Sequence, residues 1–135
     1  MRVAFGTDER TTLTEALIAH LVKSGHDVEV VADPGWWPDV GRGVGEAVAS
    51  GRAQVGVVCC WTGTGVSMAA NKVAGVRAAL CADAETARGA RRWNDANVVA
   101  LSLRLTSEQV GREVLDAFFA TEADPAEAAA VARLH

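Results

Sequence analysis

Residues 54–72 of the chain read QVGVVCCWTGTGVSMAANK and contain one complete structural unit. Residues 54–59 are predicted to form a strand, and their apolar run is typical of a central strand buried on both faces of a parallel sheet. A glycine-rich turn over residues 61–65 follows, and the pattern then predicts a helix over residues 66–72. A strand, a tight turn and a helix in this order predict an α/β fold.

The same alternation continues on both sides of this unit. Further strands are predicted at residues 2–6, 27–32, 76–80 and 97–101, and helices at residues 40–50, 84–92 and from 126 onward. Two more helices are predicted from capping-box patterns, one at Thr12 with Glu15 and one at Thr106 with Gln109. Together the elements predict a single domain over residues 1–135, with a three-layer Rossmann-like α/β fold and a five-stranded parallel sheet.

The composition predicts a cytoplasmic protein with no nucleic-acid partner and no membrane contact. The chain has 135 residues and a net charge of -4, with no basic face. No apolar run approaches the roughly 18 residues of a membrane span, and the start is not signal-like. The three cysteines form no C-x-x-C pair, which indicates reduced thiols. No cofactor and no metal are implied, because His20, His26 and His135 lie outside the predicted site loops.

Polar and reactive residues gather where the predicted strands end, at residues 7–9, 60–65, 81–83 and 102–104. Ligands of open parallel sheets bind at the carboxyl ends of the strands, although loops there are polar in any case. Cys60 is the candidate reactive group, because free backbone N–H groups and a helix dipole beside it stabilise a thiolate and an oxyanion. The alternative is a buried cysteine before a tight turn.

The other two cysteines and a phosphatase-type site are less favoured. Cys59 points to the opposite face of the strand from Cys60, and Cys81 is interpreted as structural. A tyrosine-phosphatase-type site requires an arginine six residues after the cysteine. That position is Val66, which excludes this chemistry.

Four motifs together resemble the ribose-5-phosphate isomerase B and galactose-6-phosphate isomerase family. They are Gly63-x-Gly65-x-Ser67-x-Ala69-Ala70-Asn71-Lys72, Gly75-x-Arg77-Ala78, Val3-Ala4-Phe5-Gly6-x-Asp8 and Asn94-Asp95-x-Asn97-Val98. The order and spacing of the elements match over nearly the whole chain. The resemblance implies aldose–ketose isomerisation through an enediolate, with Cys60 as the base, because Val66 occupies the position of the glutamate used by the other branch.

The resemblance also implies roles for the remaining site residues. Thr62 and the loop of Gly63, Thr64 and Gly65 would stabilise the enediolate oxygen. Asp8 would hold hydroxyl groups, Asn94 would bind a substrate oxygen, and Arg104 would help to bind a phosphate. It further implies a homodimer, with tetramers also open, in which the partner's C-terminal region completes each site.

Several positions depart from the family pattern. Glu9 stands where the family has a histidine after the first aspartate, and Trp93 stands where it has the ring-opening histidine. The C-terminal segment carries a single arginine, Arg133. All four tryptophans, the other three being Trp36, Trp37 and Trp61, fall in predicted site loops, where they line either the pocket or a dimer interface.

We therefore expect a sugar isomerase whose substrate has an altered or absent phosphate, with Glu9, Trp61 and Trp93 in the substrate pocket. Two alternatives remain: a non-catalytic ligand-binding relative, and an ordinary ribose-5-phosphate isomerase.

Overall fold

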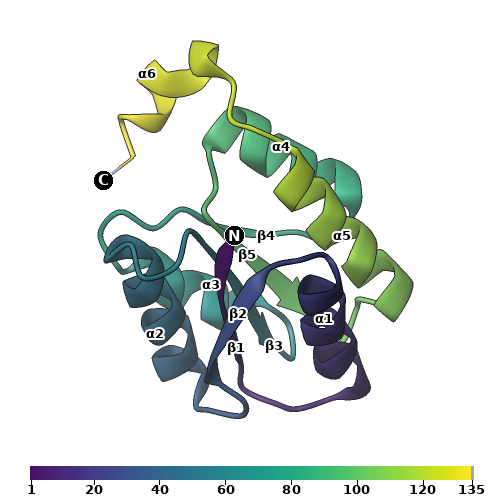
Figure 1. The fold of residues 1–135 in the computed structure, drawn as a ribbon. Helices are drawn as coiled ribbons and strands as arrows, with labels where there is room; N and C mark the ends of the chain where they lie inside the picture. Colours follow the sequence, from purple (N-terminus) through teal and green to yellow (C-terminus); the bar gives the residue numbers. More distant parts are fainter. Residues whose placement is uncertain (135) are drawn as a thin grey trace.

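The computed structural model describes residues 1–134, and His135 lies outside them. Figure 1 shows a twisted sheet covered by helices on both faces. The strands are β1 (Arg2–Thr7), β2 (Asp27–Ala32), β3 (Val55–Cys60), β4 (Ala78–Leu80) and β5 (Val98–Ser102). All neighbouring strands are parallel, in the order β2-β1-β3-β5-β4, which confirms the predicted five-stranded Rossmann-like fold.

The helices form two layers. They are α1 (Thr12–Lys23), α2 (Trp37–Ala49), α3 (Thr64–Asn71), α4 (Ala84–Asn94), α5 (Glu108–Ala120) and α6 (Ala128–Val131), with a 3-10 turn η1 (Pro125–Glu127) before the last. Helices α1, α4 and α5 bury Leu17, Ala87 and Phe118 against one face of the sheet. Helices α2 and α3 bury Val44 and Val66 against the other. β3 lies between the layers, and all six of its residues are buried.

The helix starts differ in detail from the predicted capping boxes. α1 is capped by Thr11, whose side chain accepts from the Thr14 N–H, while the Thr14 side chain accepts from the Thr11 N–H. α5 is capped by Ser107, whose hydroxyl accepts from the Val110 N–H. Each prediction was wrong by one residue, because neighbouring Thr and Ser residues can equally well act as caps.

Two tryptophans predicted in loops lie in helices instead. α2 begins at Trp37 rather than near residue 40, and α4 continues to Asn94 rather than ending near residue 92. α4 ends only where Asp95 adopts the left-handed conformation, with φ of 47°. Trp93 and Asn94 therefore belong to the last turn of α4, and this decides where they lie.

The C-terminal segment forms less helix than predicted. Instead of one alanine-rich helix, the chain makes η1 and the four-residue α6, and neither contains a buried residue. Figure 1 shows this segment beyond α4 and away from the sheet. Within residues 1–134 no helix has the length and apolar character required to cross a bilayer.

Candidate active site

The carboxyl ends of three adjacent strands bring the main candidate residues together. Thr7 of β1 lies beside Cys59 of β3, and Cys60 of β3 lies beside Ser102 of β5. Backbone hydrogen bonds continue this alignment past the strand ends, since the Asp8 N–H donates to the Cys59 carbonyl at 3.2 Å and the Arg104 N–H to the Trp61 carbonyl at 2.9 Å. Asp8, Cys60 and Arg104 therefore come from three loops that meet at one edge of the sheet.

The turn after Cys60 requires glycine at its last position. Gly63 is the N-cap of α3 and has φ of 78°, a conformation that residues with a side chain rarely adopt. A Cβ atom there would lie 2.5 Å from the Leu80 side chain and 2.9 Å from the Leu101 carbonyl carbon. The tight contact pins the start of α3 against β5, directly beyond the end of β3.

The first turn of α3 presents N–H groups to the site. The N–H groups of the first residues of a helix have no partner inside the helix, and here they belong to Thr64, Gly65 and Val66. The Thr62 and Thr64 hydroxyl oxygens lie 2.8 Å apart, so each orients the other. These donors form the type of site that stabilises a negatively charged oxygen.

The three cysteines have different surroundings. Cys59 packs with Phe5 and Leu101 on the α1 and α5 side of the sheet, and Cys81 lies in the same cluster. Burial, with smaller contributions from Cys60 and Asp8, raises the pKa of the Cys59 thiol far above its usual range. Burial, followed by the charge of Asp83, raises the pKa of Cys81 to about 11. Both thiols are therefore held in the unreactive neutral form.

Cys60 lies on the opposite face from Cys59, among α2 and α3 residues such as Val40 and Val66. It is the last residue of β3, so its side chain lies where the sheet gives way to the glycine turn and the start of α3. Its residue exposure is only 5%. A substrate must therefore reach the sulfur through the space between the strand-end loops.

Asp8 carries a buried oxygen that has no hydrogen-bond partner. Its Oδ1 atom is the only buried side-chain nitrogen or oxygen without a hydrogen-bond partner among residues 1–134. Desolvation raises the pKa of Asp8, and the neighbouring Glu9 carboxylate raises it further. An unsatisfied buried carboxylate is costly unless a ligand or proton completes it, so Asp8 is arranged to bind a donor.

Glu9 itself is exposed, although its backbone is tightly held. The buried Thr7 hydroxyl donates to the Glu9 carbonyl at 2.7 Å, and Trp61 and Arg104 are exposed at the same edge. The Ser102 hydroxyl donates to the Trp61 carbonyl at 3.1 Å and so fixes the backbone after Cys60. These exposed side chains surround the mouth of the site rather than its floor.

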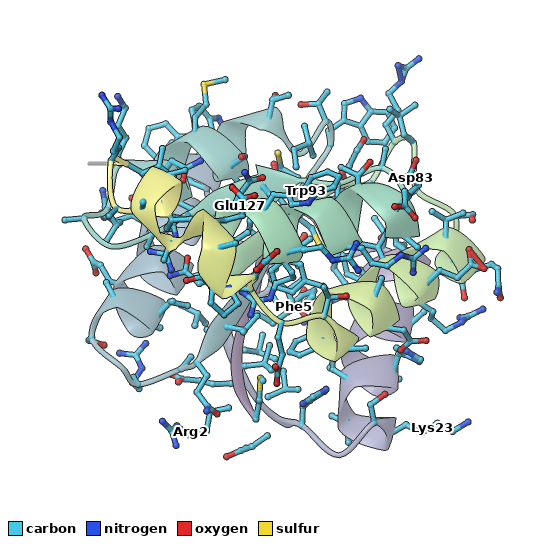
Figure 2. The ribbon with its side chains drawn as sticks, turned by 90° about the horizontal axis from the view of Figure 1, so that it is seen from above. Arg2, Phe5, Lys23, Asp83, Trp93 and Glu127 are labelled. Carbon is cyan, nitrogen blue, oxygen red and sulfur yellow. The ribbon has the colours of Figure 1, made fainter. Side chains whose placement is uncertain are left out.

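Trp93 and Asn94 do not reach this edge in the single chain. α4 begins at the carboxyl edge, where Asp83 caps it, and runs back to the opposite edge; Figure 2 labels Asp83 and Trp93 near its two ends. Val98, where β5 begins, pairs with Gly56, and Ser102 pairs with Cys60. Four residue steps of a strand span about 13 Å. Asn94, which precedes β5 and lines the cavity near the start of β4, therefore lies toward the opposite edge of the sheet from Cys60.

Both residues have other local neighbours. The Trp93 ring lies over Gly89, where a Cβ atom would be 2.8 Å from it. Asn94 lines a cavity of about 850 Å³ between the C-terminal end of α3 and the loop before β4. Asn97, from the same motif, is structural, since its side chain accepts from the Arg77 N–H at 2.8 Å.

Arg10, which the sequence analysis did not single out, lies at this edge of the sheet, and Trp37, which was predicted in a site loop, makes a contact there. Arg10 binds Asp33 across the loops after β1 and β2, with Arg10 Nε 3.3 Å from Asp33 Oδ1. Trp37 packs on Gly65, where a Cβ atom would lie 2.8 Å from the ring. One feature of the sequence could have pointed to Arg10: it directly follows Asp8 and Glu9 at the end of a predicted strand. The contact of Trp37 with Gly65 joins distant parts of the chain, and no feature of the sequence could have predicted it.

Three kinds of comparison with known proteins find the same group of similar proteins, and the family model and the relatives named below match nearly the full length of this chain. Residues 3–134 match the model of the family described as Ribose/Galactose Isomerase. The chain is 36% identical over 129 residues to ribose-5-phosphate isomerase B of Escherichia coli strain K12, covering 90% of this chain and 85% of that protein. It is 37% identical over 133 residues to galactose-6-phosphate isomerase subunit LacB of Clostridium acetobutylicum, covering 93% and 75%. The solved structure of Clostridium thermocellum ribose-5-phosphate isomerase B superposes with a TM-score of 0.92 at 34% identity, covering 98% and 94%.

Proposed function

The chain belongs to the ribose/galactose isomerase family, and we propose that it interconverts an aldose and a ketose with Cys60 as the base. Its relatives are named sugar-phosphate isomerases, which favours an enzyme over a non-catalytic ligand-binding protein. The observation that carries the proposal is the position of Cys60 at the end of β3, beside the glycine turn and the first turn of α3.

The reaction requires a proton to move between neighbouring carbons. The Cys60 thiolate takes the proton from the carbon next to the carbonyl, and the electron pair left behind forms the enediolate. The resulting thiol returns the proton to the former carbonyl carbon, and the new carbonyl forms at its neighbour. No atoms are gained or lost, so the site needs a base, donors for the oxyanion and a carrier for the hydroxyl proton.

The first turn of α3 supplies the donors. The N–H groups of Thr64 and Gly65, together with the Thr62 hydroxyl, are held in place before the substrate arrives. Preorganised donors aimed at the developing negative charge lower the barrier without reorganising in the reaction. In this proposal they bind the oxygen that becomes the enediolate.

Asp8 fits the role of proton carrier and hydroxyl ligand. Its raised pKa makes the carboxyl group more easily protonated than an ordinary aspartate, and its buried Oδ1 is free to accept a substrate hydroxyl. The hydroxyl proton that must pass between the two reacting oxygens can then travel through this carboxyl group.

The charge at the site favours a substrate with an altered or absent phosphate. Asp8 and Glu9 place two carboxyl groups side by side, and a phosphate dianion close to them is repelled. An ordinary ribose-5-phosphate isomerase remains the second candidate, because Arg10 and Arg104 lie at the same edge of the sheet and the Escherichia coli relative bears that name.

A homodimer would bring the missing residues to the site. The exposed face of α3 is centred on Met68, which is 62% exposed, and cavities of about 510 and 850 Å³ flank it. α3 is eight residues long, or about 12 Å. A two-fold axis that sets α3 antiparallel to its copy therefore brings the end near Asn94 in one subunit to the end near Gly63 in the other. Trp93 and Asn94 of the partner subunit then close the Cys60 site, and further pairing into tetramers stays open.

A substrate panel tests the proposal. Purified protein would be assayed in both directions with ribose, ribose 5-phosphate, galactose and galactose 6-phosphate. We expect turnover of at least one sugar, and kcat/KM for ribose 5-phosphate below about 10⁴ M⁻¹s⁻¹, the low end of ordinary enzymes. A higher value would favour the second candidate. Turnover of a sugar that persists in Cys60→Ala would contradict the role of Cys60.

A further inference from the structure

An ion pair ties together the two loops that follow β1 and β2. Arg10 Nη2 donates to the Asp33 carbonyl at 3.1 Å, and the same nitrogen lies 3.3 Å from Asp33 Oδ2. The Arg10 side chain is largely exposed, but that of Asp33 is only 15% exposed. Removing the arginine would leave a mostly buried carboxylate without this partner, which costs more than losing a pair in which both side chains are exposed.

The same loop is joined to β1 at a second point and leads directly into α2. The Gly35 N–H donates to the Thr7 carbonyl at 3.1 Å. A Cβ atom on Gly35 would lie 3.0 Å from Val40 and 3.1 Å from Ala32, so the loop packs closely against its surroundings. A short, tightly held segment therefore connects the Arg10–Asp33 pair to Trp37, the first residue of α2. The placement of this pair constrains where α2 begins.

Trp37 ends this chain of contacts at the first turn of α3, where it also borders the cavity of about 510 Å³ between α2 and α3. Ring atoms Cε3 and Cδ2 lie 2.8 and 3.0 Å from the place of a Cβ on Gly65. Gly65 is in the first turn of α3, among the N–H groups that face the site. Trp37 is 41% exposed, whereas its neighbour Trp36 is 72% exposed.

We propose that Trp37 is the side wall that limits the size of the substrate, and that Arg10 is the residue that positions it. The inference rests on the proposed function, because the wall matters only if the sugar binds at the first turn of α3. A flat, rigid ring packed on Gly65 occupies the space beside the first turn of α3, so a longer substrate that extends past this turn would contact it. Arg10 acts at a distance, through Asp33 and the loop to α2.

The size of the opening that leads to Cys60 can be measured by chemical labelling, without an enzyme assay. Cys60 would be alkylated with iodoacetamide and with a bulky N-aryl maleimide, and the ratio of the two rates compared between variants. Trp37→Ala should raise the maleimide-to-iodoacetamide ratio at Cys60 about tenfold, comparable to the discrimination that a few missing methylene groups provide. Trp36→Ala is the matched control and should change it less than twofold. An unchanged ratio in Trp37→Ala overturns the proposal.

The positioning role of Arg10 has its own readout. Arg10→Ala should change the intrinsic tryptophan fluorescence of the wild-type chain but not that of the Trp37→Phe chain. Arg10→Lys should restore part of the signal, and Arg52→Ala, which removes another exposed arginine that pairs with Glu29 far from Trp37, should have no effect. An equal change with and without Trp37 overturns the link between the two residues.

Kinetics separate this inference from the proposed function. With the sugar that the wild-type chain turns over fastest, Arg10→Ala should raise KM about tenfold with kcat within twofold, as expected when positioning rather than chemistry is lost. A larger loss in kcat than in KM overturns the positioning role. If the wild-type chain turns over no sugar, the proposed function fails, whereas the alkylation and fluorescence results still decide whether Trp37 limits access to Cys60.

Discussion

The two ends of the sheet both carry polar groups, but these groups are paired differently. At the amino end, His20 Nε2 lies 2.7 Å from Asp116 Oδ1, and the His26 ring stacks on Phe119 with its Nδ1 3.4 Å from the amino terminus. At the carboxyl end, Asp8 keeps a buried oxygen without a partner, and the first turn of α3 leaves N–H groups free.

The difference indicates which end is arranged for a ligand. Paired groups at the amino end satisfy one another and stabilise the fold modestly, because they are partly exposed. Unpaired groups at the carboxyl end cost free energy in the empty protein, and a substrate that completes them recovers it. Substitutions at matched positions of the two ends should therefore affect different properties.

The largest effect is expected at Cys60. Cys60→Ala should lower kcat by about a thousandfold or more, since it removes the base, and should leave the melting temperature almost unchanged. Cys59→Ser, one residue earlier but on the core face, should do the reverse, because a buried hydroxyl without a partner costs about 1–3 kcal/mol. Kinetics and thermal denaturation of both variants measure the contrast. Preferential alkylation of Cys59 or Cys81 in the native protein would count against it.

Alanine substitutions at two glycines with positive φ, one at each end of the sheet, allow the free energy of unfolding to be compared between the ends. Gly63→Ala should lower the free energy of unfolding by about 2–4 kcal/mol, since the backbone strain adds to contacts of 2.5–3.0 Å with Leu80, Leu101 and Ser102. Gly25→Ala has a φ of 90° but nothing within 4 Å of the new Cβ, so about 1–2 kcal/mol is expected. Urea denaturation measures both. Equal losses would show that packing against β5 does not hold the turn.

Asp8 should give the site a measurable dependence on pH. Because its pKa is raised in the folded protein, the folded state binds more protons than the unfolded state above the ordinary aspartate pKa of about 3.9. Its contribution to stability is therefore favourable at low pH and is lost as pH rises through the folded pKa. Asp8→Asn should remove this fall and raise stability near pH 7, while lowering kcat about tenfold or more.

The free energy of unfolding, measured by denaturation from pH 3 to pH 7, should distinguish the wild type from Asp8→Asn. A parallel pH dependence in wild type and Asp8→Asn would contradict the raised pKa of this carboxyl group.

The smallest effect is expected at the amino end. His20→Ala removes the contact with Asp116, which is exposed on the aspartate side, and should change the free energy of unfolding by less than about 1 kcal/mol. kcat/KM should stay within twofold, because the pair lies at the opposite edge of the sheet from Cys60. A large loss of activity in this variant would break the division between the two ends.

Much of the architecture could be predicted because it depends on neighbours in the sequence. The apolar run before Cys60 indicates a central strand, and the glycines after it indicate a tight turn. Both were confirmed, since a strand buried on two faces can tolerate few polar residues. The helix caps were predicted within one residue only, because adjacent Thr and Ser residues compete for the same role.

The candidate site was predictable only in part. Asp8, Cys60 and the loop from Thr62 to Gly65 follow directly from strand ends, and the parallel sheet brings strand ends together. Trp93 and Asn94 could not be placed from their motif, because their position depends on how far α4 continues before Asp95 ends it.

By itself, the sequence determined the α/β fold, the glycine turn beside Cys60 and the separation of Cys59 from Cys60 on opposite faces. These follow from the alternation of side chains along a strand and from the backbone freedom of glycine, and both act over a few residues. Only the tertiary structure decided that Arg10 holds Asp33, that Trp37 covers Gly65 and that Asn94 lies at the far edge of the sheet. Those contacts join residues distant in the chain, so they exist only once the layers have packed.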